Sequence, residues 1–180
     1  MAAARRKVLR LPRERDEQGR PANARPRDRL GRPLPRGAVD EMPDRREPYA
    51  VVATVEEALA EAVALFDAQR FFEAHEFLEW IWKSPRVHPG DRDFWKGVTQ
   101  VAVGCVHIQR GNRSGALKLL HRAAGHLRAE PRQDHGVDRA SLRAAALWLA
   151  GQVEHDEPSP DLDFPKFPRR EGALWTSLQD

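Results

Sequence analysis

One stretch of the sequence, residues 91–110, carries apolar side chains at almost every angle around a helix. Helices that are apolar on all sides occur where other elements surround them. No part of the chain shows a convincing alternation of strand type, so the surrounding elements are expected to be helices. One stripe of the central helix is Phe94, Val98, Val101, Cys105 and Ile108, and a second face carries Trp95, Val103 and Val106.

Two glycines interrupt this apolar helix at positions that lie on nearly one line, Gly97 and Gly104. Each glycine lowers helix stability by up to about 1 kcal/mol relative to alanine. Close approach of another backbone would compensate for that loss. The pair therefore predicts that a neighbouring helix packs closely along this line.

Four further helices are expected around the central one. Thr54 and Glu57 have the spacing of a capping box at the start of an Ala-rich helix. Gly111 suits the left-handed end of the central helix, and Asn112 and Asp138 suit the first positions of the two helices that follow. The expected helices span residues 54–68, 70–83, 91–110, 112–129 and 138–154. The chain is thus predicted to be all-α, with a compact single-domain bundle of about five helices over residues 49–156.

The N-terminal segment, residues 1–48, has a different composition from the bundle. It contains seven prolines and few bulky apolar residues, which predicts a disordered arm. Residues 1–50 carry 14 Lys and Arg against 8 Asp and Glu, or +6, whereas the remaining residues sum to −3. The arm can attract a nucleic acid or another anionic partner, or it can be a solvated tail. Self-association of the chain also stays open.

The C-terminal segment, residues 157–180, is Pro-rich and predicted to be an irregular tail. Its large apolar residues can pack on the bundle or mark a partner site; they are Phe164, Phe167, Leu174 and Trp175. Among the other residues, Trp148 is predicted to lie in the core and His135 to be exposed in a loop.

Cys105 is the single cysteine, so no disulfide forms within the chain. A lone thiol in an apolar run fits a reducing compartment. The sequence shows no leader-like apolar stretch and no membrane span. A cytoplasmic location is therefore expected.

Polar residues on two adjacent helices form the candidate site. Gln100 and His107 share one face of the central helix with Gly104, and buried polar groups there would need partners. The preceding helix supplies four polar side chains, and two large aromatics, Phe72 and Trp80, lie within its acidic arc. Because a solvated face rarely carries such aromatics, His107 is predicted to lie within hydrogen-bonding reach of a carboxylate on that helix. The full candidate set is Glu73, His75, Glu76, Glu79, Gln100 and His107.

Three uses of this cluster stay open. It is a structural hydrogen-bond network, a metal or small-ligand site, or an acid–base site of a hydrolase-like enzyme. His75 and Glu79 are spaced i, i+4 and, with His107, would offer nitrogen and oxygen ligands to a divalent metal such as Zn, Mn or Fe. The duplicated Glu-x-x-His unit of di-iron bundles is absent. Whether the chain is an enzyme is left undecided.

Residues 60–128 resemble a known bacterial family, domain of unknown function 309. The resemblance implies a compact helical bundle and carries no activity over to this chain. The matching residues are Glu73, Ala74, His75, Glu76, Glu79 and Trp82 in FFEAHEFLEWIWK, followed by Gln100, His107, Gly111, Asn112, Gly115 and Ala116.

Overall fold

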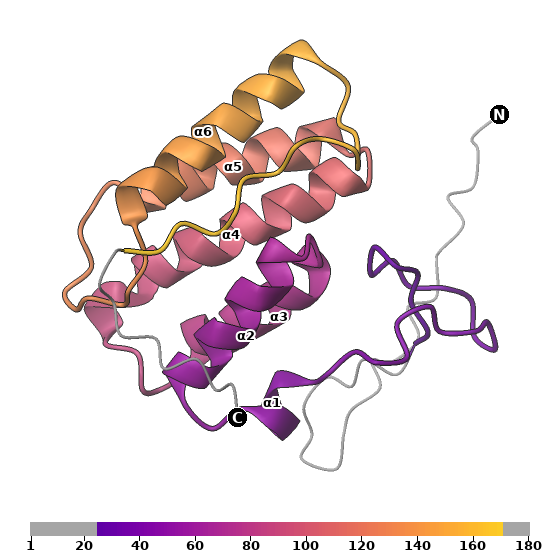
Figure 1. The fold of residues 1–180 in the computed structure, drawn as a ribbon, viewed down its shortest axis with the longest axis horizontal. Helices are drawn as coiled ribbons and strands as arrows, with labels where there is room; N and C mark the ends of the chain where they lie inside the picture. The colour runs from indigo at the N-terminus through magenta and orange to yellow at the C-terminus, as the bar shows by residue number, and fades with distance from the viewer. Residues whose placement is uncertain (1–24, 171–180) are drawn as a thin grey trace, which may run out of the picture. The chain divides into compact units, whose positions relative to one another are not determined.

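The structure, a computed structural model, describes residues 25–170 (Figure 1). These residues form helices and no strand apart from two isolated bridges, which confirms the all-α prediction. All five expected helices are present, each within three residues of its expected ends. The helices are α1 (Pro48–Val51), α2 (Val55–Asp67), α3 (Phe71–Lys83), α4 (Arg92–Gln109), α5 (Arg113–His126) and α6 (Arg139–His155), with a 3₁₀ turn, η1, at Pro89–Asp91.

The chain divides into two compact units at the Met42–Pro43 boundary. In the first unit, residues 25–42 form turns closed by backbone hydrogen bonds, such as Leu34 N–H to Pro26 C=O at 2.8 Å. The Asp28 carboxylate accepts further bonds from two backbone N–H groups within this stretch. The expected disorder of residues 1–24 lies outside the described residues.

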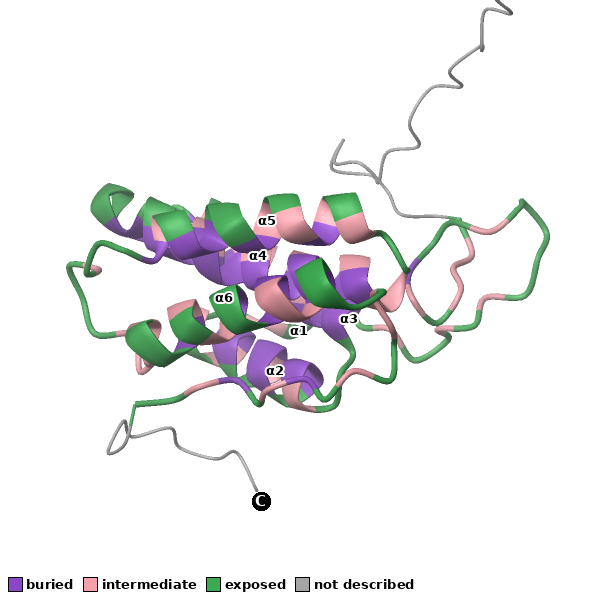
Figure 2. Cartoon of the chain, turned by 90° about the horizontal axis from the view of Figure 1, so that it is seen from above, coloured by how far each residue is buried: buried purple, intermediate pink, exposed green. Residues whose placement is uncertain are grey.

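In the second unit, α4 is enclosed, as its apolar pattern predicts. It packs against α3 on one side and α5 on another, while α2 covers α3 and α6 covers α5 (Figures 1 and 2). Trp95 and Cys105 in α4 have no exposed surface. The centre of this unit is therefore the helix that the sequence singles out.

The two glycines of α4 set its approach to α5. A Cβ atom at Gly104 would lie 2.7 Å from Leu120 Cδ2, and one at Gly97 would lie 2.9 Å from Leu127 Cγ. Both distances are too short for real contacts, so only glycine fits at this spacing. The predicted close helix approach is confirmed, and the partner is α5.

The predicted helix ends are confirmed by their capping bonds. Thr54 accepts from the Glu57 N–H, and the Glu57 side chain returns to the Thr54 N–H, which completes the capping box. Asn112 and Asp138 accept from backbone N–H groups in the first turns of α5 and α6. Gly111 has a φ of +68°, the left-handed conformation expected where α4 ends.

The segment after α6 packs on α2 and α3. The ring centres of Phe164 and Phe71 lie 4.7 Å apart, and those of Phe167 and Phe66 lie 5.4 Å apart. Phe164 and Phe167 are each 5 % exposed. The Phe167 N–H donates to Asp67 Oδ1 at 2.7 Å. The sequence left open whether the apolar residues of this tail pack on the bundle or mark a partner site. Phe164 and Phe167 pack on the bundle. Leu174 and Trp175 lie outside the described residues.

One predicted core residue is exposed. Trp148 in α6 is 46 % exposed, and its neighbour Leu147 is 39 % exposed. The prediction is wrong because α6 is an outer helix that packs mainly against α5, so one of its faces meets solvent. Within residues 25–170, no helix is both long and apolar enough to span a membrane.

Candidate functional site

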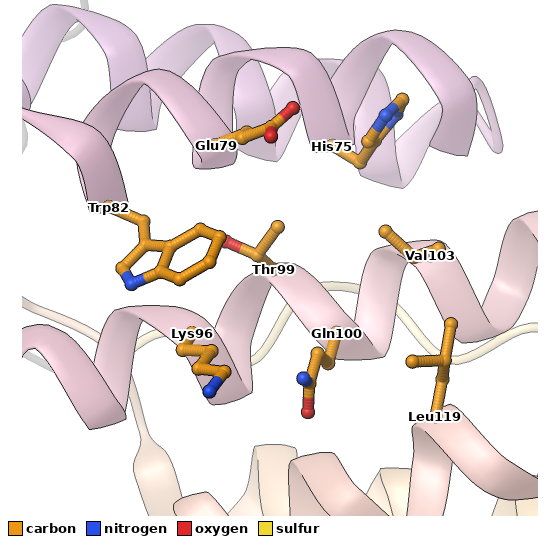
Figure 3. A pocket seen from close by; sticks show the side chains of 8 residues that line it. All are labelled: His75, Glu79, Trp82, Lys96, Thr99, Gln100, Val103 and Leu119. Atoms are coloured by element: carbon orange, nitrogen blue, oxygen red, sulfur yellow. The ribbon is translucent and has the colours of Figure 1, made fainter.

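A pocket of about 250 Å³ lies between α3, α4 and α5 and is partly open to solvent. Figure 3 shows the side chains that line it. We refer to it as the α3–α4–α5 pocket. Three of the candidate residues, His75, Glu79 and Gln100, line it, whereas Glu73, Glu76 and His107 do not. Its lining residues are His75, Glu79, Trp82, Lys96, Thr99, Gln100, Val103 and Leu119.

The α3 wall is a single stripe of side chains at helical spacing, His75, Glu79 and Trp82 (Figure 3). His75 Nδ1 bonds the Phe72 carbonyl. A carbonyl only accepts, so Nδ1 carries a proton. The Glu79 carboxylate forms an ion pair with Lys83, one turn further along the helix, at 2.5 Å.

The α4 wall carries Lys96, Thr99, Gln100 and Val103. The Thr99 hydroxyl donates to the Trp95 carbonyl at 2.8 Å, so its proton is already used. The Lys96 ammonium lies 6.0 Å from the centre of a Trp82 ring, at the outer limit of a cation–π contact. Lys96 and Gln100, spaced i, i+4, extend from the same side of α4 (Figure 3).

Gln100 is the polar residue of this pocket that carries a buried hydrogen-bond acceptor without a donor among residues 25–170. Its Oε1 atom is buried and accepts no hydrogen bond from residues 25–170. A buried acceptor without a partner costs about 1–3 kcal/mol. The fold thus leaves the hydrogen-bonding capacity of this oxygen unused among the described residues.

The prediction for His107 is wrong, because this side chain turns to α5 and not to a carboxylate of α3. Asn112 Oδ1 accepts from the Gly115 N–H at 2.9 Å, which makes Asn112 Nδ2 the donor to His107 Nδ1, also at 2.9 Å. The imidazole is then neutral, with its proton on Nε2. Burial, together with the positive charge of Arg110, holds the pKa of His107 below its usual value. The face that His107 shares with Gly104 meets α5, as the Gly104–Leu120 approach requires.

The remaining acidic candidates also lie outside the pocket. Glu73 is 4 % exposed and forms two hydrogen bonds with Arg70, at 2.7 and 2.6 Å. This interaction raises the pKa of the Arg70 guanidinium. Glu76 on the same helix is half-buried. Glu73 and Glu79 thus each pair with a basic residue close to them in the sequence.

Residues 25–170 contain no group of three or more His, Cys, Asp or Glu side chains placed to hold a metal ion. His75 and Glu79 line the pocket, but His107 is engaged with Asn112. The structure therefore does not bring the three proposed metal ligands together.

Comparison with known proteins finds a family match over the part of the chain that forms this pocket. Residues 59–119 match the model of a domain of unknown function, DUF309. This part of the chain is similar to DUF309 domains. It is also 36 % identical over 92 residues to YpuF of Bacillus subtilis strain 168, an uncharacterised protein; the match covers 49 % of this chain and 52 % of YpuF. The chain thus spans about half the length of the curated relative that it matches.

Every residue that lines the pocket lies inside the DUF309 match, from His75 to Leu119. A second polar cluster, formed by Asp91 and His135, extends beyond the matched residues. We call it the Asp91–His135 junction, because it ties the start of α4 to the loop between α5 and α6. The pocket therefore lies within the residues that match the family model, whereas the junction joins these residues to the segment that follows.

The sequence gives no sign of this junction and predicts an exposed His135. Asp91 has no exposed surface and accepts from the Arg132 N–H at 2.6 Å and from His135 Nε2 at 3.0 Å. Burial opposes the charge on Asp91, but these hydrogen bonds outweigh it and lower the pKa of the carboxyl. His135 stacks on Phe94 at 5.5 Å, and its side chain is only 13 % exposed. The prediction of an exposed His135 is wrong because Asp91 and Phe94 hold the ring against α4.

Proposed function

We propose that this chain binds a small molecule in the α3–α4–α5 pocket. The observation that carries this proposal is the buried Gln100 Oε1 atom, which accepts no hydrogen bond from residues 25–170. Proteins satisfy nearly all of their buried polar atoms, so an unpaired atom on a residue that lines a pocket favours a partner from outside the described residues. A ligand that donates to this oxygen would remove the cost of leaving it unpaired.

The shape of the pocket supports the same proposal. Small-molecule sites are concave and mostly apolar, with a few polar groups that orient the ligand. Trp82, Val103 and Leu119 form apolar walls here, while Glu79, Lys96 and Gln100 supply charge and hydrogen-bonding groups. The volume of about 250 Å³ lies just below the common range of roughly 300–1,000 Å³. We therefore expect a ligand smaller than a nucleotide.

A purely structural role for the polar cluster has less support. In such a network the acidic and histidine side chains would satisfy Gln100. Instead, Glu79 pairs with Lys83, and His107 pairs with Asn112. These contacts are complete without Gln100, so they do not account for a buried amide at the pocket wall.

A metal-dependent hydrolase also has less support than binding. That chemistry requires a set of ligands for the metal, and residues 25–170 offer no group of three suitable side chains. The pocket contains two residues of opposite charge, Glu79 and Lys96, and the amide of Gln100. These groups can bind a ligand without catalysing a reaction.

A library of fragments below about 200 Da tests the proposal, with thermal shift measured on the full chain. The matched variants are Val103→Phe, which fills the pocket, and Leu147→Phe, which enlarges an exposed residue of α6. We expect some fragments to raise Tm of the natural chain and of Leu147→Phe, and to lose this effect in Val103→Phe. Shifts that persist in Val103→Phe, or a library with no binder, would refute the proposal.

A further inference from the structure

The charges that line the α3–α4–α5 pocket also indicate which class of molecule it takes. Resting on the proposed function, we infer that the ligand is a small zwitterion, of the kind represented by a free amino acid. Its ammonium group would be held by Glu79, and its carboxylate by Lys96 and the N–H group of the Gln100 amide. Three features of the lining favour this class of ligand.

The first feature is an acceptor with spare capacity on α3. The Glu79 carboxylate has about four lone-pair positions, and its ion pair with Lys83 uses only part of them. An ammonium group donates three hydrogen bonds and carries the charge that Glu79 attracts, so it suits this carboxylate.

The second feature is a lysine whose polar partner is missing from the described residues. The Lys96 ammonium contacts the Trp82 ring at 6.0 Å, and no hydrogen bond or ion pair joins it to another group of residues 25–170. This contact is weak at such a distance. A carboxylate would give Lys96 a charge-assisted hydrogen bond, and the Gln100 amide beside it in Figure 3 carries N–H donors for the same group.

The third feature is the balance of the two charges. Glu79 and Lys96 line the same small pocket with opposite sign, so the lining is neutral overall when His75 is neutral. A ligand with one charge would displace water from both groups and compensate only one of them. A zwitterion compensates both, and its hydrocarbon side chain can lie against Trp82, Val103 and Leu119.

The test uses the full chain and the twenty protein amino acids, added singly and detected by saturation-transfer NMR. The amino acid that binds most tightly is then compared by calorimetry with its decarboxylated amine and its deaminated acid. For leucine these are 3-methylbutylamine and 4-methylpentanoate. We expect each one-charge analogue to bind at least tenfold more weakly than the amino acid.

Two variants assign each charge of the ligand to its residue, and a third variant is the control. Glu79→Gln should weaken binding of the amino acid and the amine but leave the acid unchanged. Lys96→Met should weaken binding of the amino acid and the acid but leave the amine unchanged. Lys83→Met is the control, since Lys83 pairs with Glu79 outside the pocket lining; we expect this variant to bind the amino acid at least as tightly as the natural chain.

The outcomes separate this inference from the function on which it rests. An amine or acid that binds as tightly as the amino acid would overturn the zwitterion, as would an amino acid whose affinity is insensitive to both Glu79→Gln and Lys96→Met. If no amino acid binds while fragments still lose their effect in Val103→Phe, the inference of a zwitterionic ligand is wrong, and the proposal of a small-molecule site in this pocket is supported. If neither amino acids nor fragments bind, both are wrong.

Discussion

The two polar clusters along α4 differ in how completely the protein satisfies them. At the Asp91–His135 junction, both carboxylate oxygens of a fully buried Asp91 receive hydrogen bonds from a loop about forty residues away. In the α3–α4–α5 pocket, Gln100 Oε1 is buried and receives none from the described residues, although solvent reaches the pocket. The junction thus ties α4 to the loop between α5 and α6, whereas the described residues leave an acceptor of the pocket residue Gln100 without a donor.

Removing Asp91 should have the largest effect on stability. Asp91→Ala leaves the Arg132 N–H and the His135 ring without their buried partner, and we expect a loss of about 3 kcal/mol in the free energy of unfolding. For a chain of this size, Tm should fall by roughly 6–12 °C. Urea denaturation and calorimetry would measure both quantities.

Asp93→Ala is the matched control for Asp91, because Asp93 is exposed and forms only a surface pair with His126, at 3.5 Å. Such a pair contributes about 0–1 kcal/mol. Equal losses for Asp91→Ala and Asp93→Ala would remove the distinction between the junction and an ordinary surface interaction.

The spacing of α4 and α5, next to the pocket, depends on Gly104. In Gly104→Ala the new Cβ would lie 2.7 Å from Leu120 Cδ2, so the helices must shift, and we expect a loss of about 1–3 kcal/mol. Gly125→Ala in α5 meets no atom within 4 Å and should instead gain up to about 1 kcal/mol of helix propensity. Opposite signs in chemical denaturation support the close approach, and two gains would contradict it.

Removing the unpaired oxygen should stabilise the unliganded protein. Gln100→Leu replaces a buried acceptor by an apolar side chain, so we expect a gain of about 1 kcal/mol in the free energy of unfolding. Gln109→Leu, on the same helix, loses the hydrogen bond from Gln109 Nε2 to the Gln69 carbonyl at 3.0 Å and should cost about 0.5–1.5 kcal/mol. If Gln100→Leu is as destabilising as Gln109→Leu, Gln100 has a partner within the protein.

The smallest expected effect concerns pH. The pKa of His107 is lowered in the folded protein, mainly by burial and also by Arg110, so the unfolded chain binds a proton first as pH falls. Stability from this group is therefore present above its unfolded pKa of about 6.5 and is lost as pH falls through the lower folded value. Stability curves from pH 8 to 5 should be flatter for His107→Gln than for the natural chain. Identical slopes would contradict a neutral His107 in the folded protein.

The helices were predictable because their signals are local. Thr54, Asn112 and Asp138 begin helices through bonds to residues three positions away, and Gly111 ends one through its own backbone. The central place of α4 follows from its composition alone. For the same reason, His75, Glu79 and Gln100 were recognisable as one candidate site from spacing within two neighbouring helices.

The remaining features depend on packing that the sequence does not state. Periodicity shows that Gln100 and His107 share a face, but not that this part of α4 meets α5 at Gly115. The bond between Asp91 and His135 joins positions 44 residues apart and leaves no periodic signal. An apolar residue such as Trp148 shows its exposure only once α6 is known to be an outer helix.

The most direct test of the central claim is a titration of the full chain followed by NMR at the pocket itself. The Gln100 side-chain amide and the Trp82 indole N–H report on it, with the tightest-binding amino acid as the probe. We expect both signals to shift in a saturable manner in the natural chain and to stay in place in Val103→Phe. Saturable shifts confined to residues outside the α3–α4–α5 pocket, or equal shifts in Val103→Phe, would contradict the claim that this pocket is the binding site.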